Sequence, residues 1–371
     1  MRASNVLGII YASVDDDKIS ELTAVRTIGS VPFAGRYRLI DFALSNMVNA
    51  GITAVGVSTK SNYRSLMDHL GAGKPWDLSR KRDGLTILPP FDLAGNGGVS
   101  RNRIEALHAM LNYMGNSNKE YVLLADANVV ATIDYEALME HHEKSGADIT
   151  IAYRRGKKPN LPDIMTFTFG DDDRITRAVV LDNGPGDKDY SLNVLFMKRA
   201  LLERLVGEAL TAGATEFEKD VINANCEKLY IRGEKFDGFA CTIDSLQTYY
   251  DVSMKLVEGQ YKGLFRKDLP VYTKVRDDMP AIYGTKSRAA NSLIADGCII
   301  KGTVENSILF RGVYVAEGAV VKNSVLMQDS YISEGAKVNC AVLDKNVVIK
   351  PNKELSGAAT CPLFIGKDVT V

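Results

Sequence analysis

Cysteine is scarce in this sequence of 371 residues, and the five that occur are odd in number and widely spaced. They are Cys226, Cys241, Cys298, Cys340 and Cys361. No two of them have the C-x-x-C spacing that is typical of zinc and redox sites, so the sequence gives no sign of a thiolate metal centre. Their number and spacing instead favour buried, reduced thiols in a cytoplasmic protein.

An excess of charge of either sign is also lacking. Lys and Arg number 45 against 46 Asp and Glu, which leaves a net charge of −1, so we expect no nucleic-acid partner and no attraction to an anionic membrane. The longest apolar runs, such as residues 6–12, are far too short to span a bilayer. The first five residues lack the pattern of a signal peptide.

The most informative absence is that of glycine after the first apolar run. Residues 6–12 predict a short buried strand of the kind that opens a nucleotide-binding α/β domain. The next residues, 13–18, hold no glycine and three consecutive aspartates, Asp15 to Asp17. Glycine lets backbone N–H groups approach a phosphate, whereas carboxylates repel it. The segment therefore predicts a nucleotide-binding framework that has lost its contacts to the nucleotide.

Residues 1–255 alternate strand-like and helix-like segments. Residues 54–58 and 121–125 are compact apolar runs suited to buried parallel strands, and residues 103–111 space their apolar side chains as a helix does. The alternation predicts an α/β fold with a doubly wound, mostly parallel, Rossmann-like sheet of the nucleotidyltransferase type. Residues 256–288, which are charged and contain Pro270 and Pro280, are predicted to be a linker.

From residue 289 to 371 a repeat replaces the helical pattern. Asn291-Ser292 returns as Asn306-Ser307, Asn323-Ser324 and Asn339-Cys340, with spacings of 15, 17 and 16 residues. Within each repeat aliphatic residues recur every six positions, and glycines fit the turns between short strands. These hexapeptide-type repeats predict a left-handed parallel β-helix whose apolar ladders are buried by stacking of the coils.

Residues 31–46, VPFAGRYRLIDFALSN, together with the β-helix behind them, resemble bacterial glucose-1-phosphate adenylyltransferase (ADP-glucose pyrophosphorylase). The resemblance covers nearly the whole chain and is supported by residues 216–220 and 242–245. It implies a role in glycogen biosynthesis, where that family converts ATP and glucose 1-phosphate to ADP-glucose and diphosphate.

The chain departs from nearly all the catalytic motifs that the resemblance implies. The glycine- and arginine-bearing loop falls on Ser13, Val14, Asp15 and Asp16, and the following lysine falls on Ile28. The Gly-Thr-Ala-Asp-Ala motif is matched by residues 102–106, whose sequence is Asn-Arg-Ile-Glu-Ala. The two magnesium-binding carboxylates are matched to Asn128 and Phe239, and the lysine that holds the sugar phosphate to Leu181. We therefore expect no catalytic residue, no metal site and no cofactor bound by this chain.

The pattern is similar to that of the regulatory, D-type subunit that some bacteria pair with a catalytic homologue. The resemblance implies a heterotetramer in which magnesium is held by the catalytic partner and this chain modulates its activity. Arg36 occupies the place of a basic residue that the family links to a sugar-phosphate activator. Arg38, Lys60 and Arg64 are further effector candidates. Alternatively, these arginines pair with carboxylates such as Asp41 or contact a partner subunit.

Two other functions have to be weighed. The chain could itself be a divergent but active adenylyltransferase, in which Asp126, two residues before Asn128, supplies the carboxylate. A hexapeptide-repeat acyltransferase is disfavoured, because that chemistry commonly needs a histidine base among the coils and residues 286–371 contain no histidine.

Overall fold

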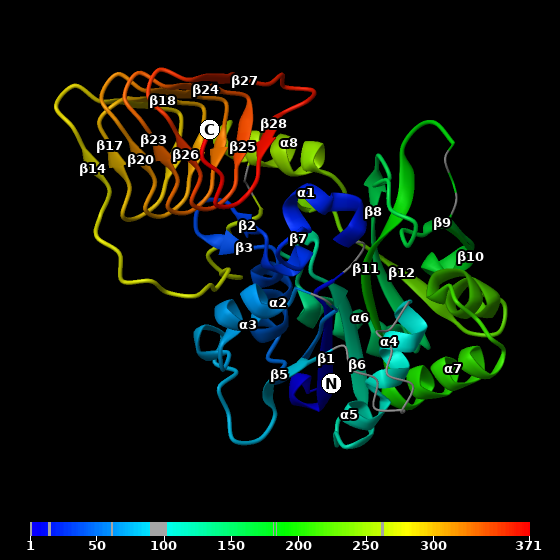
Figure 1. Ribbon diagram of the computed structural model, residues 1–371. Coiled ribbons are helices and arrows are strands. Elements are labelled where there is room, and N and C mark those ends of the chain that lie inside the picture. The colour runs from blue at the N-terminus through cyan, green and yellow to red at the C-terminus, as the bar shows by residue number, and fades with distance from the viewer. Residues whose placement is uncertain are drawn as a thin grey trace.

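The computed structural model describes residues 2–13, 16–60, 62–89, 102–180, 182, 184–260 and 263–371. Two parts follow one another along the chain (Figure 1): an N-terminal α/β unit and a C-terminal stack of β-coils. The predicted loop positions Val14, Asp15 and Leu181 lie outside the described residues, as does the side chain of Asp16.

The N-terminal unit is built on a nine-stranded mixed sheet. Seven of its strands run in the order β10-β9-β11-β6-β1-β4-β5, and β8 lies between β11 and β12. The central neighbours β6, β1, β4 and β5 are parallel, whereas β11 runs antiparallel to β6 and β8. The strands are β1 (Val6–Tyr11), β4 (Ala54–Ser58), β5 (Gly84–Leu88), β6 (Tyr121–Asp126), β8 (Ile149–Gly156), β9 (Thr166–Phe169), β10 (Ile175–Val179), β11 (Lys188–Lys198) and β12 (Ile231–Lys235). The predicted doubly wound nucleotidyltransferase sheet is thus confirmed.

Helices cover both faces of this sheet. Val6 and Ile10 of β1 pack in the cluster beneath α2, α3 and α6, whereas Leu7 and Ile9 pack in the cluster beneath α4 and α7. This alternation makes β1 apolar throughout, because both of its faces are buried. The helices are α1 (Ser20–Thr23), α2 (Ile40–Asn49), α3 (Arg64–Leu70), α4 (Arg103–Ala109), α5 (Leu111–Gly115), α6 (Tyr135–Ser145), α7 (Arg199–Thr211) and α8 (Leu246–Val257). Among the described residues no helix combines the length and apolar character needed to cross a membrane.

The C-terminal part consists of three five-stranded parallel sheets wound around one apolar interior, and it confirms the predicted hexapeptide-type β-helix. The first sheet, here called sheet E, contains β14 (Ile282–Tyr283), β17 (Ile299–Ile300), β20 (Tyr314–Val315), β23 (Tyr331–Ile332) and β26 (Val348–Ile349). Sheet F contains β15 (Arg288–Ala290), β18 (Thr303–Glu305), β21 (Val320–Lys322), β24 (Lys337–Asn339) and β27 (Glu354–Ser356). Sheet G contains β16 (Leu293–Ile294), β19 (Ile308–Leu309), β22 (Val325–Leu326), β25 (Ala341–Leu343) and β28 (Leu363–Ile365). The first strand, β14, falls inside the segment 256–288 that the sequence assigns to the linker.

The repeat of asparagines forms a ladder along one corner of the β-helix. Asn291, Asn306 and Asn323 have positive φ angles of 43°, 47° and 46°, and each donates its side-chain amide to the asparagine of the next coil. In the fourth coil the left-handed position is taken by Cys340, with a φ of 47°, because Val325 pairs with Val342. The fourth repeat is therefore spaced 17 residues from the third, and the predicted spacing of 16 is wrong. The sequence repeat points to Asn339, which lies one residue before the corner position in the fourth coil. Its side chain still accepts a hydrogen bond from Asn323.

Sheet G packs on the N-terminal unit. Ile308 and Val325 point outward from this sheet and are fully buried in a cluster with Phe33 and Phe42 of the N-terminal unit and with residues of α8. In Figure 1, β25 and β28 accordingly lie on the side of the β-helix next to α8. The hydroxyl of Tyr249 on α8 also donates to the carbonyl of Pro32 at 2.8 Å. This packing fixes the β-helix against residues 31–42, the segment that carries the family resemblance.

Candidate functional site

The edge of the sheet where β1 and β6 end is where an open α/β sheet usually binds its ligand. Tyr11, the last residue of β1, pairs with Asp126, the last residue of β6. The strands that flank β1 on its two sides, β4 and β6, both run parallel to it, so their carboxyl ends meet here. This edge is the first candidate site.

A single arginine fills the site. Arg103 lies at the start of α4, and its guanidinium is 2.8 Å from the carboxylate of Asp126 and 3.3 Å from that of Glu218. A third carboxylate, Asp163, lies 3.9 Å away, and the guanidinium stands over the ring of Tyr11 at 4.4 Å. Only 11% of the Arg103 side chain is exposed, so these ion pairs are formed largely out of water.

Three carboxylates face one guanidinium, and burial with this excess of negative charge favours the protonated forms of two of them. Burial, together with repulsion from Asp126, raises the pKa of Asp163 to about 6 although Arg103 opposes the shift. Burial also raises the pKa of Glu218 to about 7, again against the attraction of Arg103. The side-chain amide of Asn193 donates to Asp126 at 2.7 Å and to Asp163 at 3.2 Å. The carboxylate of Asp126 is therefore bound both by the guanidinium of Arg103 and by the amide of Asn193.

Arg103 and Glu218 are separated by 115 positions in the sequence, and no sequence motif links them. Arg103 is held in place because Asn102 caps α4, accepting a hydrogen bond from the N–H of Glu105 at 2.9 Å. Glu218 is presented by the π-helical segment Phe217–Ile222. These two residues are the functional candidates that the sequence analysis missed, although it did note that residues 102–106 depart from the family motif.

The predicted degenerate positions lie inside the protein as structural residues. Ile28 is fully buried in the cluster shared with the β-helix, and Phe239 packs against that cluster. Ser13 accepts a hydrogen bond from the N–H of Lys60 at 3.1 Å. The amide of Asn128 donates to the carbonyl of Ile243 at 3.4 Å. None of these four side chains carries a charge.

The structure also shows the surroundings of the two positions matched to carboxylates that hold the same metal, Asn128 and Phe239. The strands β7 (Val129–Ala131) and β13 (Ala240–Thr242) are antiparallel with Thr242 opposite Val129. Continued by one residue, this register sets Ile243 opposite Asn128, whose carbonyl accepts a hydrogen bond from the N–H of Ile243 at 2.9 Å. Both the hydroxyl of Thr242 and the amide oxygen of Asn128 are buried without a hydrogen-bond partner.

The residues present do not fit a magnesium ion. Mg²⁺ in nucleotide sites is held by carboxylates, but Asn128 offers only a neutral amide oxygen and Phe239 offers no side-chain oxygen. The carboxylate of Asp126 is already bound to a fixed guanidinium. Within the part of the chain that the structure describes, no cluster of three or more His, Cys, Asp or Glu side chains is arranged to hold a metal ion.

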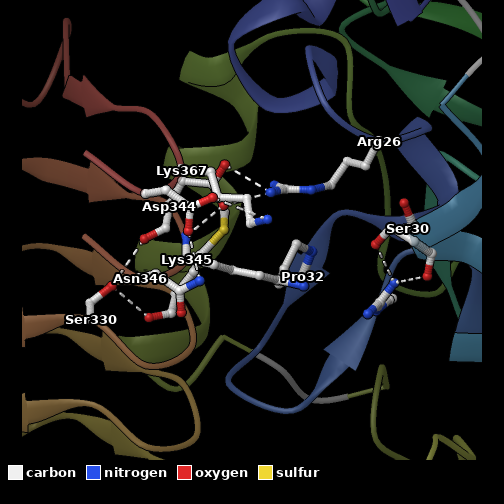
Figure 2. A network of polar contacts seen from close by, with 12 residues as sticks. Arg26, Ser30, Pro32, Ser330, Asp344, Lys345, Asn346 and Lys367 are labelled. Atoms are coloured by element: carbon white, nitrogen blue, oxygen red, sulfur yellow. Dashed lines mark hydrogen bonds and ion pairs between the residues drawn. The ribbon is translucent and has the colours of Figure 1, made fainter. Parts of the chain in front are cut away.

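A second cluster of charges lies where the N-terminal unit meets the β-helix. Figure 2 shows Arg26 reaching toward Asp344 of the β-helix, with Lys345 and Lys367 beside it. One terminal nitrogen of Arg26 donates to both oxygens of Asp344, at 2.8 and 2.9 Å, and both side chains are at most 3% exposed. Burial, together with nearby Arg38 and Arg26, lowers the pKa of Lys345 to about 7. The junction therefore holds more cations than carboxylates.

The four effector candidates differ in burial and in the groups that they contact. Arg38 donates to the carbonyl and hydroxyl oxygens of Ser65, and burial lowers its pKa to about 10. Arg36 is exposed and stands beside the ring of Tyr37. Lys60 is half-buried, and Arg64 is exposed at the start of α3. Of the four, Arg38 is the one whose charge acts on the junction residue Lys345.

The structure also shows what contacts Asp41, the alternative partner proposed for these arginines. The carboxylate of Asp41 accepts hydrogen bonds from the backbone N–H of Arg38, at 2.9 Å, and pairs with His69. The guanidinium of Arg38 is instead directed to Ser65.

Comparisons with known proteins agree with this architecture. The family model described as nucleotidyl transferase matches residues 8–177, and the model described as GlmU-like, C-terminal hexapeptide matches residues 279–358. Glycogen biosynthesis protein GlgD of Bacillus subtilis (strain 168) is 37% identical over 98% of this chain and 96% of its own length. GlgD of Geobacillus stearothermophilus is 36% identical over 86% of this chain and 83% of its own. The glucose-1-phosphate adenylyltransferase of Pseudothermotoga lettingae is 33% identical over 85% of this chain and 76% of its own.

Proposed function

This chain belongs to the glucose-1-phosphate adenylyltransferase (ADP-glucose pyrophosphorylase) family, and we propose that it serves that enzyme as a regulatory subunit without adenylyltransferase activity of its own. In glycogen biosynthesis it would assemble with a catalytic homologue, as a heterotetramer, and change the activity of that homologue. The similarity to two proteins named GlgD supports a role in glycogen biosynthesis.

The ion cluster around Arg103 carries the proposal. Nucleotidyl transfer needs a divalent cation, held by carboxylates, to neutralise charge on the reacting phosphates. Here the carboxylate at the end of β6, Asp126, is neutralised by a guanidinium of the protein itself, 2.8 Å away. The guanidinium offers no coordination positions for phosphate oxygens as a bound metal ion does, and its donors already face Asp126 and Glu218. The arrangement supports retention of the fold with loss of the chemistry.

One observation favours the alternative of a divergent active enzyme. Asp126 does lie at the strand end beside Tyr11, where a catalytic carboxylate would be useful. For Asp126 to bind a metal ion, however, Arg103 and Asn193 would both have to release it. Magnesium-dependent activity that is lost in Asp126→Ala would support this alternative.

Effector binding is the second part of the proposal. A sugar phosphate is the ligand class that suits a surface with Arg36 and Arg38, because guanidinium groups bind phosphate oxygens in pairs. Lys345 and Lys367, which the sequence analysis did not name, lie at the adjoining junction (Figure 2) and would add positive charge. If Arg36→Ala and Arg38→Ala leave the response of the mixed enzyme to every sugar phosphate unchanged, this part is wrong.

The regulatory role is tested by mixing. The purified chain is added to a purified catalytic homologue, and ADP-glucose formation is measured across glucose 1-phosphate and ATP concentrations. We expect the two proteins to elute together and the mixture to differ from the catalytic homologue in kcat or KM. Two proteins that elute apart, with kinetics equal to those of the homologue alone, would contradict the proposal.

A further inference from the structure

One lysine at the junction of the N-terminal unit and the β-helix lies among other cations. In Figure 2 this residue, Lys345, and Pro32 of the N-terminal unit face one another across the junction. The charged groups that act most strongly on the amine of Lys345 are three cations and one carboxylate: Arg38, Arg26, Lys367 and Asp344. The side chain is half-buried, so the junction confines it while solvent still reaches it.

The carboxylates near this lysine are already paired with other cations. Asp344 accepts hydrogen bonds from Arg26 at 2.8 and 2.9 Å. Asp368 lies 3.3 Å from the amine of Lys367. Among the described residues, no carboxylate lies within ion-pair distance of the amine of Lys345. The junction therefore places this amine beside positive charge without giving it an anionic partner.

These surroundings favour the neutral form of the amine. Burial and the neighbouring cations lower the pKa of Lys345 from its ordinary value of 10.5 to about 7. At neutral pH the share of side chains with a free electron pair on Nζ is therefore on the order of a thousandfold larger than for an ordinary lysine. A desolvated lysine beside another cation is one of the ways in which proteins make an amine nucleophilic.

The same cations that keep the amine neutral are suited to a phosphate group. Guanidinium and ammonium groups bind phosphate oxygens through charge-assisted hydrogen bonds. Arg38 and Lys367 both act on the amine of Lys345, so a phosphate bound to them would lie near a nucleophile. A ligand that carries an electrophilic carbon directly attached to phosphate matches both properties of the junction. An acyl phosphate has this structure.

We propose that Lys345 is a modification site, at which the side-chain amine takes the acyl group of an acyl phosphate. The neutral Nζ attacks the acyl carbon, an N–C bond forms, and the C–O bond between the acyl carbon and the phosphate breaks. The phosphate leaves with the electron pair of that bond, and the attacking nitrogen gives one proton to water. The product is a neutral amide that no longer takes up a proton.

Acylation would remove a cation from the surface proposed above for the sugar phosphate. This consequence for effector binding rests on the proposed function, whereas the acylation itself does not depend on it. The two fail separately: a chain that changes no catalytic homologue can still be acylated at Lys345, and a regulatory subunit can remain unmodified. The acylation is therefore tested on the purified chain alone.

The full chain is incubated with acetyl phosphate at about pH 7.5 and digested, and mass spectrometry measures the acetylated fraction at each lysine. We expect the fraction at Lys345 to exceed that at Lys337 by about tenfold or more. Lys337 is the internal control because its ammonium group is exposed and faces Glu354 at 3.6 Å instead of other cations. Equal acetylated fractions at the two lysines would overturn the proposal.

Two conditions separate this directed reaction from the general reactivity of amines. Inorganic phosphate should protect Lys345 and leave Lys337 unchanged, because it competes for the cations of the junction. Acetylation at Lys345 should rise from pH 6 to pH 8 and then level off, since the amine is protonated below about pH 7 and neutral above it. Acetylation of Lys345 that phosphate does not reduce would overturn the proposal.

A variant tests the contribution of the neighbouring cations. Lys367→Met removes one of the charges that act on Lys345 and should lower its acetylated fraction by about threefold. The matched control is Lys353→Met, which removes an exposed lysine of the same β-helix and should leave that fraction unchanged. Equal effects of the two substitutions would show that the cations of the junction do not direct the reaction, and would overturn the proposal.

Discussion

At the scale of single residues, the candidate site is defined by carboxylates that share one guanidinium. Asp126, Asp163 and Glu218 converge on Arg103, and Asn193 adds a donor to two of them. Because three buried carboxylates share this one guanidinium, removing Arg103 would leave their negative charge uncompensated. The cluster thus keeps Asp126 paired with a cation of the protein itself.

The first prediction concerns Glu218 and pH. Its pKa is raised to about 7 in the folded protein, so the folded state binds the proton more tightly than the unfolded state does. Its carboxyl group therefore stabilises the fold at pH 4 relative to pH 8, and this contribution is lost as pH rises through 7. Glu218→Gln, which is always neutral, should gain stability relative to wild type by on the order of 3 kcal/mol between pH 4 and pH 8.

The measurement is urea unfolding of wild type and Glu218→Gln at a series of pH values. Comparing the two proteins at each pH removes the contributions of the other titrating groups. Glu216→Gln, which changes an exposed neighbour of the same charge, is the matched control and should show no such trend. A stability difference between wild type and Glu218→Gln that stays constant with pH would contradict the prediction.

Residue identities alone predict part of this site. The sequence shows that Asn128 and Ile28 are uncharged where a charge is needed. It does not show that Asn128 bonds to Ile243, because the register of β7 with β13 is set by tertiary structure. The ion pair of Arg103 with Glu218 spans 115 residues and has no local signature.

At the scale of elements, the β-helix depends on corner residues that accept a left-handed backbone. Asn306 has a φ of 47°, accepts a hydrogen bond from Asn291 at 2.8 Å and donates one to Asn323 at 3.3 Å. Asn306→Ala should destabilise the protein by about 2 kcal/mol, because alanine is strained in this conformation and both ladder bonds are lost.

Asn306→Gly separates the two causes. Glycine accepts the positive φ without strain and loses only the ladder bonds, so its cost should be smaller than that of alanine. Thermal or urea unfolding of both variants gives the comparison. A glycine variant that is less stable than the alanine variant would show that backbone strain is not the larger cause.

Elements were the part of the fold that the sequence predicted best. The six-residue aliphatic period and the alternation of strands with helices both depend on local order, so they are visible in the sequence. The errors occurred where one residue changed the local pattern. Cys340 takes the corner position of an asparagine, and the helix predicted over 103–111 is interrupted at Met110, between α4 and α5.

At the scale of the whole molecule, one buried ion pair joins the two parts of the chain. Arg26 and Asp344 are 318 residues apart in sequence, and both are buried. Arg26→Met and Asp344→Asn should each cost about 3–5 kcal/mol, because each leaves the partner charge buried and alone. The double variant should cost clearly less than the sum, since it removes both charges.

Urea unfolding of the two single variants and the double variant measures the coupling free energy between Arg26 and Asp344. Arg80→Met, which removes an exposed arginine from a surface pair with Asp77, is a control that should change stability little. Costs that add up in the double variant would show that the two charges do not stabilise each other, and that the junction is held by its apolar cluster alone.

Whether the chain is catalytic is tested most directly by ADP-glucose formation by the purified chain alone, with magnesium and saturating ATP and glucose 1-phosphate. We expect no turnover above the uncatalysed background, because Arg103 holds Asp126 and the positions Asn128 and Phe239 carry no charge. Robust magnesium-dependent turnover by the chain alone would contradict it and would show that Asp126 is released to bind the metal ion.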